Sequence, residues 1–282
     1  MIVSMKEMLA DAAKGGYAVG GFNCASLESA IAAVRASEEM DMPFILQHTT
    51  AHEQYVPLSV IGPIMIQLAR GAKTPVAVHL DHGSSLENCL CALAMGFTSV
   101  MFDGSALPFA ENAEITARVA KTAHALGATV EAELGSMPCN FNGELGDYTP
   151  EDFYTRPEEA AEFAERTGVD ALAISFGTVH GIYKTTPKLS IDVIERVRKA
   201  TNGLPLVMHG GSGLTDGDYH AAIAAGIRKV NYYTYGALAG GRAVYDVVRR
   251  IPEGLQFHDV AVAATDAIAN DIKRVMEVLS GR

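Results

Sequence analysis

The chain has 282 residues, 49% of them hydrophobic and 20% charged, with a formal net charge of −11. This composition is that of a folded globular protein, and the acidic excess argues against nucleic acid as the main partner. No apolar run reaches the length of a membrane span, so no membrane partner is expected.

The opening segment, MIVSMKEMLADAAKGG, predicts a helix and lacks the apolar core of a signal peptide. The four cysteines, at 24, 89, 91 and 139, form no CxxC pair. Cys89 and Cys91 stand two residues apart in a helical segment and so point to different faces, which favours a structural role over metal binding. We therefore expect reduced thiols and a cytoplasmic protein.

Short β-branched, apolar runs then alternate with longer segments of helical period, which often end in glycine. Strands that are apolar almost throughout indicate a parallel sheet buried on both faces. Eight such units predict a single (β/α)₈ (TIM) barrel over residues 1–282, with an open doubly wound sheet as the alternative. The predicted strands cover 18–24, 43–49, 75–82, 98–105, 129–136, 171–180, 204–213 and 229–234.

The longest irregular stretch covers about 136–156 and follows the fifth predicted strand. It is rich in Gly, Asn, Pro and Asp. Because loops of this length in a compact domain are usually functional or mobile, we expect a mobile loop beside the site.

Polar residues gather where the predicted strands end, which is where barrel enzymes place their active sites. We therefore expect them to form one site. They are Asn23, His48, Thr49, Thr50, Asp81, His82, Asp103, Ser105, Glu131, Glu133, His180, His209, Asn231 and Thr234.

Three histidines, His82, His180 and His209, come from three different strand ends. Three neutral imidazoles with an open position form a catalytic zinc site, although other divalent metals also accept imidazole. His79 lies deeper on its strand and is expected in the core or behind the ligands. His48 and His52 are weaker loop candidates, since a lone histidine is usually a core residue.

Asp81 stands beside a predicted ligand, so a bound cation would keep it ionised. Two roles stay open, a base or a partner that orients a histidine. Strand alternation would aim Asp81 and His82 to opposite faces, and we expect Gly83 to provide the bend that brings both to the mouth.

Two segments are suited to an anion. HGGSG (209–213) offers flexible backbone amides and a hydroxyl before a helix, and NYYT (231–234) offers the same groups at the last strand end. Loops after strands seven and eight are the frequent phosphate site of such barrels. Gly181 would let a ligand approach the backbone.

With these residues in place, the chain resembles the class II, zinc-dependent ketose-bisphosphate aldolases, which include fructose- and tagatose-bisphosphate aldolases. The resemblance covers nearly the whole chain. It rests on GFN (21–23), HLDHG (79–83), SVMFDGS (99–105), VEAELG (130–135), GTVHGIY (177–183), PLVMHGGSG (205–213) and KVN (229–231).

The resemblance implies a role for each matching residue. His82, His180 and His209 match the zinc ligands, Glu133 a spare ligand or its neighbour, and Asp81 the catalytic acid/base. The positions that match the dihydroxyacetone phosphate site are Gly181, Gly210, Gly211, Ser212, Asn231, Tyr232, Tyr233 and Thr234, and Asn231 also steadies the enediolate. Asn23, Thr49 and Lys184 are further substrate-binding candidates. Those matching a monovalent cation site (Na⁺ or K⁺) are Val179, Gly181, Gly210 and Ser212.

The implied reaction is reversible cleavage of a ketose 1-phosphate or 1,6-bisphosphate to dihydroxyacetone phosphate and an aldehyde, as in glycolysis. Zinc acts as the Lewis acid, Asp81 takes the proton of the C4 hydroxyl, and no lysine Schiff base is required. The resemblance also implies a homodimer or homotetramer.

The chain departs from the family pattern at three places. The loop reads SMPCNFNGELGDY, where Glu144 or Asp147 is the candidate proton donor and Phe141 is nearer the usual place of the acid. Thr49 replaces a serine, and LQFHDVA (255–261) stands where an Asp-Pro-Arg is usual. The aldehyde half is therefore left open, including an unphosphorylated or modified one.

Two other classes compete with an aldolase. Zinc barrel hydrolases commonly carry His-x-His on the first strand, which GGFNC lacks. The other is a sugar-phosphate-binding barrel without turnover.

Overall fold

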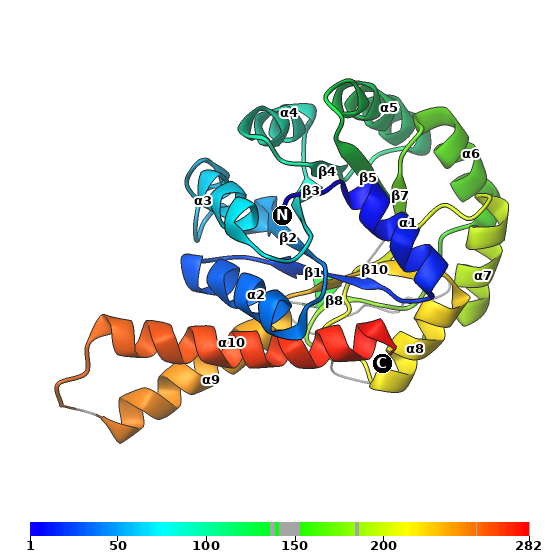
Figure 1. Ribbon diagram of the computed structural model, residues 1–282. Coiled ribbons are helices and arrows are strands. Elements are labelled where there is room, and N and C mark those ends of the chain that lie inside the picture. Colours follow the sequence, from blue (N-terminus) through cyan, green and yellow to red (C-terminus); the bar gives the residue numbers. More distant parts are fainter. Residues whose placement is uncertain (136–138, 141–152, 184–185, 252, 282) are drawn as a thin grey trace.

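A computed structural model of the chain describes residues 1–135, 139–140, 153–183, 186–251 and 253–281. Its main sheet is a closed barrel of parallel strands in the order β1-β10-β9-β7-β5-β4-β3-β2, surrounded by helices (Figure 1). The (β/α)₈ prediction is confirmed and the open sheet is excluded. The barrel strands are β1 (Val19–Asn23), β2 (Phe44–Thr49), β3 (Val76–Gly83), β4 (Ser99–Phe102), β5 (Thr129–Leu134), β7 (Ala171–Ile174), β9 (Leu206–Met208) and β10 (Ile227–Tyr232).

The helices begin and end at residues suited to capping. The Ser26 and Ser85 side chains accept hydrogen bonds from backbone amides of the first turns of α2 and α4, and glycines in the left-handed conformation end α1, α4 and α6. The helices are α1 (Met5–Gly15), α2 (Leu27–Met40), α3 (Leu58–Gly71), α4 (Leu86–Met95), α5 (Phe109–Ala125), α6 (Pro157–Thr167), α7 (Ile191–Ala200), α8 (Asp216–Ala225), α9 (Thr234–Arg250) and α10 (Phe257–Ser280), with a 3₁₀ turn, η1 (Thr50–His52).

The core has two parts, one on each side of the barrel wall. The larger part fills the space between strands and helices. The smaller lies inside the barrel, where Met5 and Leu9 of α1 pack against Val19, Ile45 and Ala77 near the starts of β1, β2 and β3. Helix α1 therefore closes the end of the barrel opposite the strand ends that bear the polar residues.

The sixth predicted strand is too long. Strand β7 ends at Ile174, and His180 lies in a separate short strand, β8 (His180–Gly181), which pairs with β6 (Cys139–Asn140). Gly177 has a φ of +115°, and its backbone lies against the Lys188 carbonyl, where a Cβ would not fit. This turn carries the chain away from the barrel wall.

The last two helices, α9 and α10, pack against each other and form a hairpin that projects from the barrel (Figure 1). Helix α10 also packs on α2. Of the described helices, none has the length and apolar character to cross a membrane. Cys24 and Cys89 are buried, Cys91 is exposed, and all three are free thiols.

Candidate metal centre and active site

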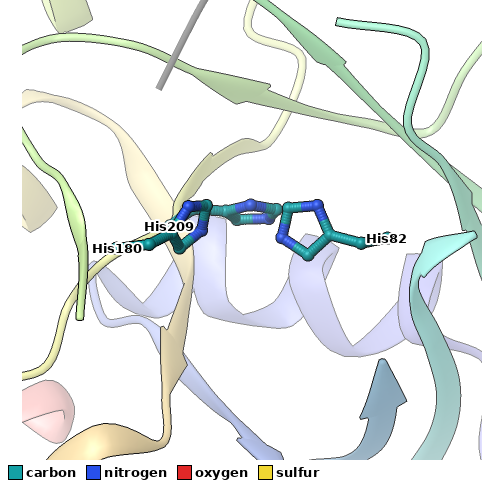
Figure 2. A group of neighbouring side chains, drawn as sticks. All are labelled: His82, His180 and His209. Carbon is teal, nitrogen blue, oxygen red and sulfur yellow. The ribbon is translucent and has the colours of Figure 1, made fainter. Parts of the chain in front are cut away.

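The three histidines predicted as metal ligands lie together at the mouth of the barrel (Figure 2). Ring centroids are 4.6 Å apart for His82 and His209, 5.2 Å for His82 and His180, and 5.8 Å for His180 and His209. One ring nitrogen from each lies within 4.8 Å of the others. The structure thus brings together three imidazoles from β3, from β8 and from the residue after β9.

Carboxylates behind the rings fix their orientation. His82 Nδ1 lies 2.7 Å from Asp103 Oδ2, and His209 Nε2 lies 2.9 Å from Glu131 Oε1. Carboxylate–histidine pairs of this kind set the tautomer of metal-binding imidazoles. They leave His82 Nε2 and His209 Nδ1 as the nitrogens available to a metal.

Glu133 also faces the centre. Its Oε2 is 3.1 Å from His209 Nδ1, and both atoms are buried with no hydrogen-bond partner among the described residues. Burial opposes protonation of His209, but Glu131 and Glu133 outweigh it and raise its pKa to about 10. Without a metal, this position thus holds a proton on His209; a divalent cation that accepts imidazole fits the same position beside the carboxylates and would displace that proton on binding.

The backbone at His82 explains how Asp81 and His82 both reach the mouth. His82 has a φ of +47°, and the pairing of β3 with β4 shifts between Leu80 and Gly83. The bend therefore lies at His82 and not at Gly83, where we expected it. Gly83 is needed for a close approach instead, because a Cβ there would lie 2.5 Å from the Met101 carbonyl oxygen.

Two asparagines hold the carboxylate of Asp81, which is only 1% exposed. Asn231 Nδ2 donates to Oδ1 at 2.8 Å, and Asn23 Nδ2 donates to Oδ2 at 2.9 Å. Burial alone would raise the pKa of Asp81, but positive charge on His82 and Lys229 outweighs burial and holds the pKa well below its usual range. Asp81 is therefore an ionised proton acceptor beside the histidines.

A buried ion pair beneath the site was missed by the sequence analysis. Lys229 Nζ lies 2.7 Å from Glu131 Oε2, and both side chains are 0% exposed. Burial opposes ionisation of Glu131, but Lys229 and His209 lower its pKa to about 2. The sequence did contain a signal for the burial of Lys229. Lys229 and Asn231 are two residues apart on one strand, so their side chains point to the same face, inside the barrel.

His79 belongs to the same buried layer, as its deeper position predicted. Its Nδ1 lies 2.7 Å from Ser99 Oγ, and its Nε2 lies 3.6 Å from Glu131 Oε2. His79, Asp81 and Glu131 form a second group with metal-ligand spacing. Lys229 already neutralises Glu131 there, so we assign no metal to this group.

The two predicted anion segments meet at the start of α9. Ser212 Oγ accepts hydrogen bonds of 3.0 Å from the backbone amides of Tyr233 and Thr234. These amides stand at a helix N-terminus, where an anion is favoured. Gly210 has a φ of +67°, and a Cβ there would clash with the Val179 carbonyl.

Tyr183 connects the segment that carries His180 to these loops, a role that sequence reasoning missed. Its hydroxyl donates to the Gly210 carbonyl at 2.8 Å and accepts from the Val179 amide at 3.1 Å. Gly181 follows His180 in β8, and the Gly211 amide donates to the Asn231 carbonyl. Both glycines therefore lie in the segments that surround the start of α9.

The remaining candidates differ in their placement. Thr49 pairs with Asp81 at the end of β2, and the Tyr233 ring lies 4.4 Å from that of His52. The Tyr232 side chain lies outside the barrel, where its hydroxyl donates to Asp271, so only its backbone is near the mouth. His48 is a buried β2 residue, not a loop residue. The candidates at 141, 144, 147 and 184 lie outside the described residues.

A (β/α)₈ barrel with a histidine cluster and an ionised carboxylate at the carboxyl ends of its strands has the architecture of a metal-dependent enzyme. The family model described as fructose-bisphosphate aldolase class-II matches residues 3–282. The chain belongs to this family and is an aldolase, a carbon–carbon lyase; family members are typically metal-dependent.

Relatives support the same assignment along the whole chain. A fructose-bisphosphate aldolase of Staphylococcus epidermidis is 40% identical over 278 residues, covering 96% of this chain and 95% of the relative. A fructose-bisphosphate aldolase of Geobacillus stearothermophilus is 40% identical over 273 residues, which cover 95% of this chain and 93% of the relative. The crystal structure of the YdjI aldolase from Escherichia coli K12 superposes with a TM-score of 0.86 at 32% identity. The superposition covers 99% of this chain and 97% of that aldolase.

Proposed function

We propose that the chain is a zinc-dependent aldolase that cleaves a ketose 1-phosphate or 1,6-bisphosphate of the fructose or tagatose type. The products are dihydroxyacetone phosphate and an aldehyde, and the reaction is reversible. The observation that carries the proposal is the ionised, doubly hydrogen-bonded Asp81 directly beside three converging imidazoles.

His82, His180 and His209 would hold the metal, with Glu133 as a further ligand or neighbour. Zinc suits three neutral imidazoles best. When bound, it supplies a Lewis acid that polarises the ketose carbonyl.

Asp81 accepts the proton of the C4 hydroxyl, which lets the C3–C4 bond break and leaves the electron pair on the dihydroxyacetone phosphate half. Asn23 and Asn231 hold the carboxylate in place for this transfer. Asn231 would also stabilise the developing negative charge through its side-chain amide. Candidates for the acid that returns a proton to C3 are Glu144 and Asp147.

The phosphate of the substrate would lie at the start of α9. It would be surrounded by the backbone amides of Tyr233 and Thr234 and by Ser212, Gly181, Gly210 and Gly211. In the structure, both amides donate hydrogen bonds to the Ser212 hydroxyl. Asn23, Thr49 and Lys184 are further substrate contacts in this proposal. Backbone oxygens of Val179, Gly181, Gly210 and Ser212 would bind Na⁺ or K⁺.

The α9–α10 hairpin supports a homodimer or homotetramer. Its projecting part exposes apolar side chains, including Tyr245 at 59% and Phe257 at 80%. Large exposed apolar groups on one arm are typical of an interface. We also place the protein in the cytoplasm, which its free thiols support.

The test is an assay of zinc-loaded protein with ketose mono- and bisphosphates of both C4 configurations, coupled to detection of released triose phosphate. Cleavage of at least one would support the proposal and define the C4 configuration and the far end of the substrate. Binding of these sugars without any turnover would instead indicate a sugar-phosphate-binding barrel.

A further inference from the structure

Beneath Asp81, inside the barrel, polar atoms from β10, β1, β2 and β3 are buried without hydrogen-bond partners among the described residues. Both amide atoms of Gln47 are among them, and this side chain is 0% exposed. Buried polar groups nearly always have a partner, and an orphaned one is destabilising. The atoms are Asn23 Oδ1, Gln47 Oε1, Gln47 Nε2, His79 Nε2 and Asn231 Oδ1.

The orientation of the two asparagines is fixed by Asp81. An ionised carboxylate only accepts hydrogen bonds, so Asn23 and Asn231 must both turn their Nδ2 atoms toward it. Their Oδ1 atoms are therefore acceptors that face away from Asp81, and each needs a donor.

Gly21 shows how closely two of these oxygens approach each other. A Cβ on Gly21 would lie 2.5 Å from Gln47 Oε1 and 3.1 Å from Asn231 Oδ1. Two oxygens that near to one point are within reach of a single bridging water, which holds its partners at about 2.8 Å on either side. Two amide oxygens cannot hydrogen-bond to each other, and one water between them would donate to both.

We propose that the interior beneath Asp81 is a binding site for ordered water, held by Gln47, Asn231 and Asn23, and that Gln47 acts through this water as a positioning residue for Asp81. The positioning role rests on the function proposed for Asp81. The hydration site does not.

Water fits this group better than a monovalent cation. Amide oxygens suit either ligand, but Gln47 Nε2 is a donor and needs an acceptor. Water donates to the oxygens and accepts from the nitrogen, whereas a cation would leave the nitrogen without a partner. Rotating the Gln47 amide would turn Nε2 toward Asn231 Oδ1, but Gln47 Oε1 and Asn23 Oδ1 would each still need a donor, which water supplies.

The direct test is a high-resolution crystal structure of the zinc-loaded protein. We expect a density peak within hydrogen-bond distance of the Gln47 amide and of Asn231 Oδ1. A dry interior would overturn the hydration site. So would a peak that an anomalous signal in rubidium-soaked crystals identifies as a monovalent cation site.

The functional test compares Gln47→Met, which keeps the size but removes the amide, with Ile45→Met, one inward position earlier on β2. We expect Gln47→Met to lower kcat about 10-fold, with KM and zinc content unchanged. Ile45→Met should retain kcat. An unchanged kcat in Gln47→Met would overturn the positioning role. If Asp81→Ala keeps its turnover, the proposed function of Asp81 fails, and the density still decides the hydration site.

Discussion

The hydroxyl of Thr50 donates a hydrogen bond of 2.6 Å to the backbone carbonyl of His82, the residue whose φ is +47°. A left-handed conformation is unfavourable for a residue with a side chain, and neighbouring contacts have to hold it. The turn η1 after β2 thus supports the one bend that directs both Asp81 and His82 into the mouth.

Thr50→Val should therefore weaken metal binding while the barrel stays folded. Loss of the hydrogen bond lets the His82 backbone relax, and changes behind a metal ligand typically weaken binding by about 10-fold or more. The measurement is zinc affinity by competition with a chelator. Thr122→Val, which removes a hydroxyl that donates to its own helix α5, is the control. Equal affinity in both variants would contradict this role of Thr50.

Asp81→Ala should lower turnover by about 10²–10⁴-fold, the usual contribution of a positioned acid or base. Zinc content should stay near that of the unchanged protein, because three histidines hold the metal. Metal analysis and steady-state kinetics on the same preparation check both points. Loss of zinc would show instead that Asp81 is a structural partner of the metal.

Glu131→Gln should destabilise the fold by about 3–5 kcal/mol, because it leaves the buried Lys229 ammonium without its counter-charge. The free energy of unfolding is measured by denaturant titration. The double variant Glu131→Gln with Lys229→Met should recover part of the loss, since it removes both members of the pair. A double variant less stable than Glu131→Gln would contradict the ion-pair account.

Asp170 predicts a specific pH dependence of stability. It accepts hydrogen bonds from the Val130 amide at 2.9 Å and from His124 Nε2 at 2.8 Å, and it pairs with Lys6 of α1 at 2.9 Å. Burial opposes its ionisation, but these partners outweigh burial and lower its pKa.

A folded pKa below the unfolded value, about 3.9, adds stability that is fully present above that value and is lost as pH falls through the folded pKa. Asp170→Asn should thus be less stable at pH 7, by about 2 kcal/mol. The difference from the unchanged protein should shrink as pH falls below about 4. Urea titrations across this range, with chelator throughout, measure it. A difference that is independent of pH would contradict the assignment.

The barrel was predictable because each βα unit carries its own signals, namely apolar strands, serine caps and glycine ends. The sixth strand was drawn too long because 171–180 has no charged residue and is mostly apolar before His180. Only the crowding of Gly177 against the Lys188 carbonyl shows where the chain turns away. Strand ends depend on such long-range contacts, which composition does not reveal.

The gathering of the three histidines at the barrel mouth was predictable from the sequence, but the geometry of the site was not. The bend at His82 depends on Thr50, which is remote in sequence. Lys229 was missed because a lysine in a strand is usually exposed, and its burial follows from the ion pair with Glu131 across the barrel. Tyr183 was missed because a tyrosine hydroxyl shows its partners only in three dimensions.

Metal removal followed by zinc return tests the central claim most directly. The cleavage rate of the best ketose phosphate is measured in the loaded protein, after complete chelation, and after zinc is added back. We predict loss of cleavage on chelation and recovery with about one zinc per chain. Cleavage that continues unchanged in metal-free protein would contradict the account.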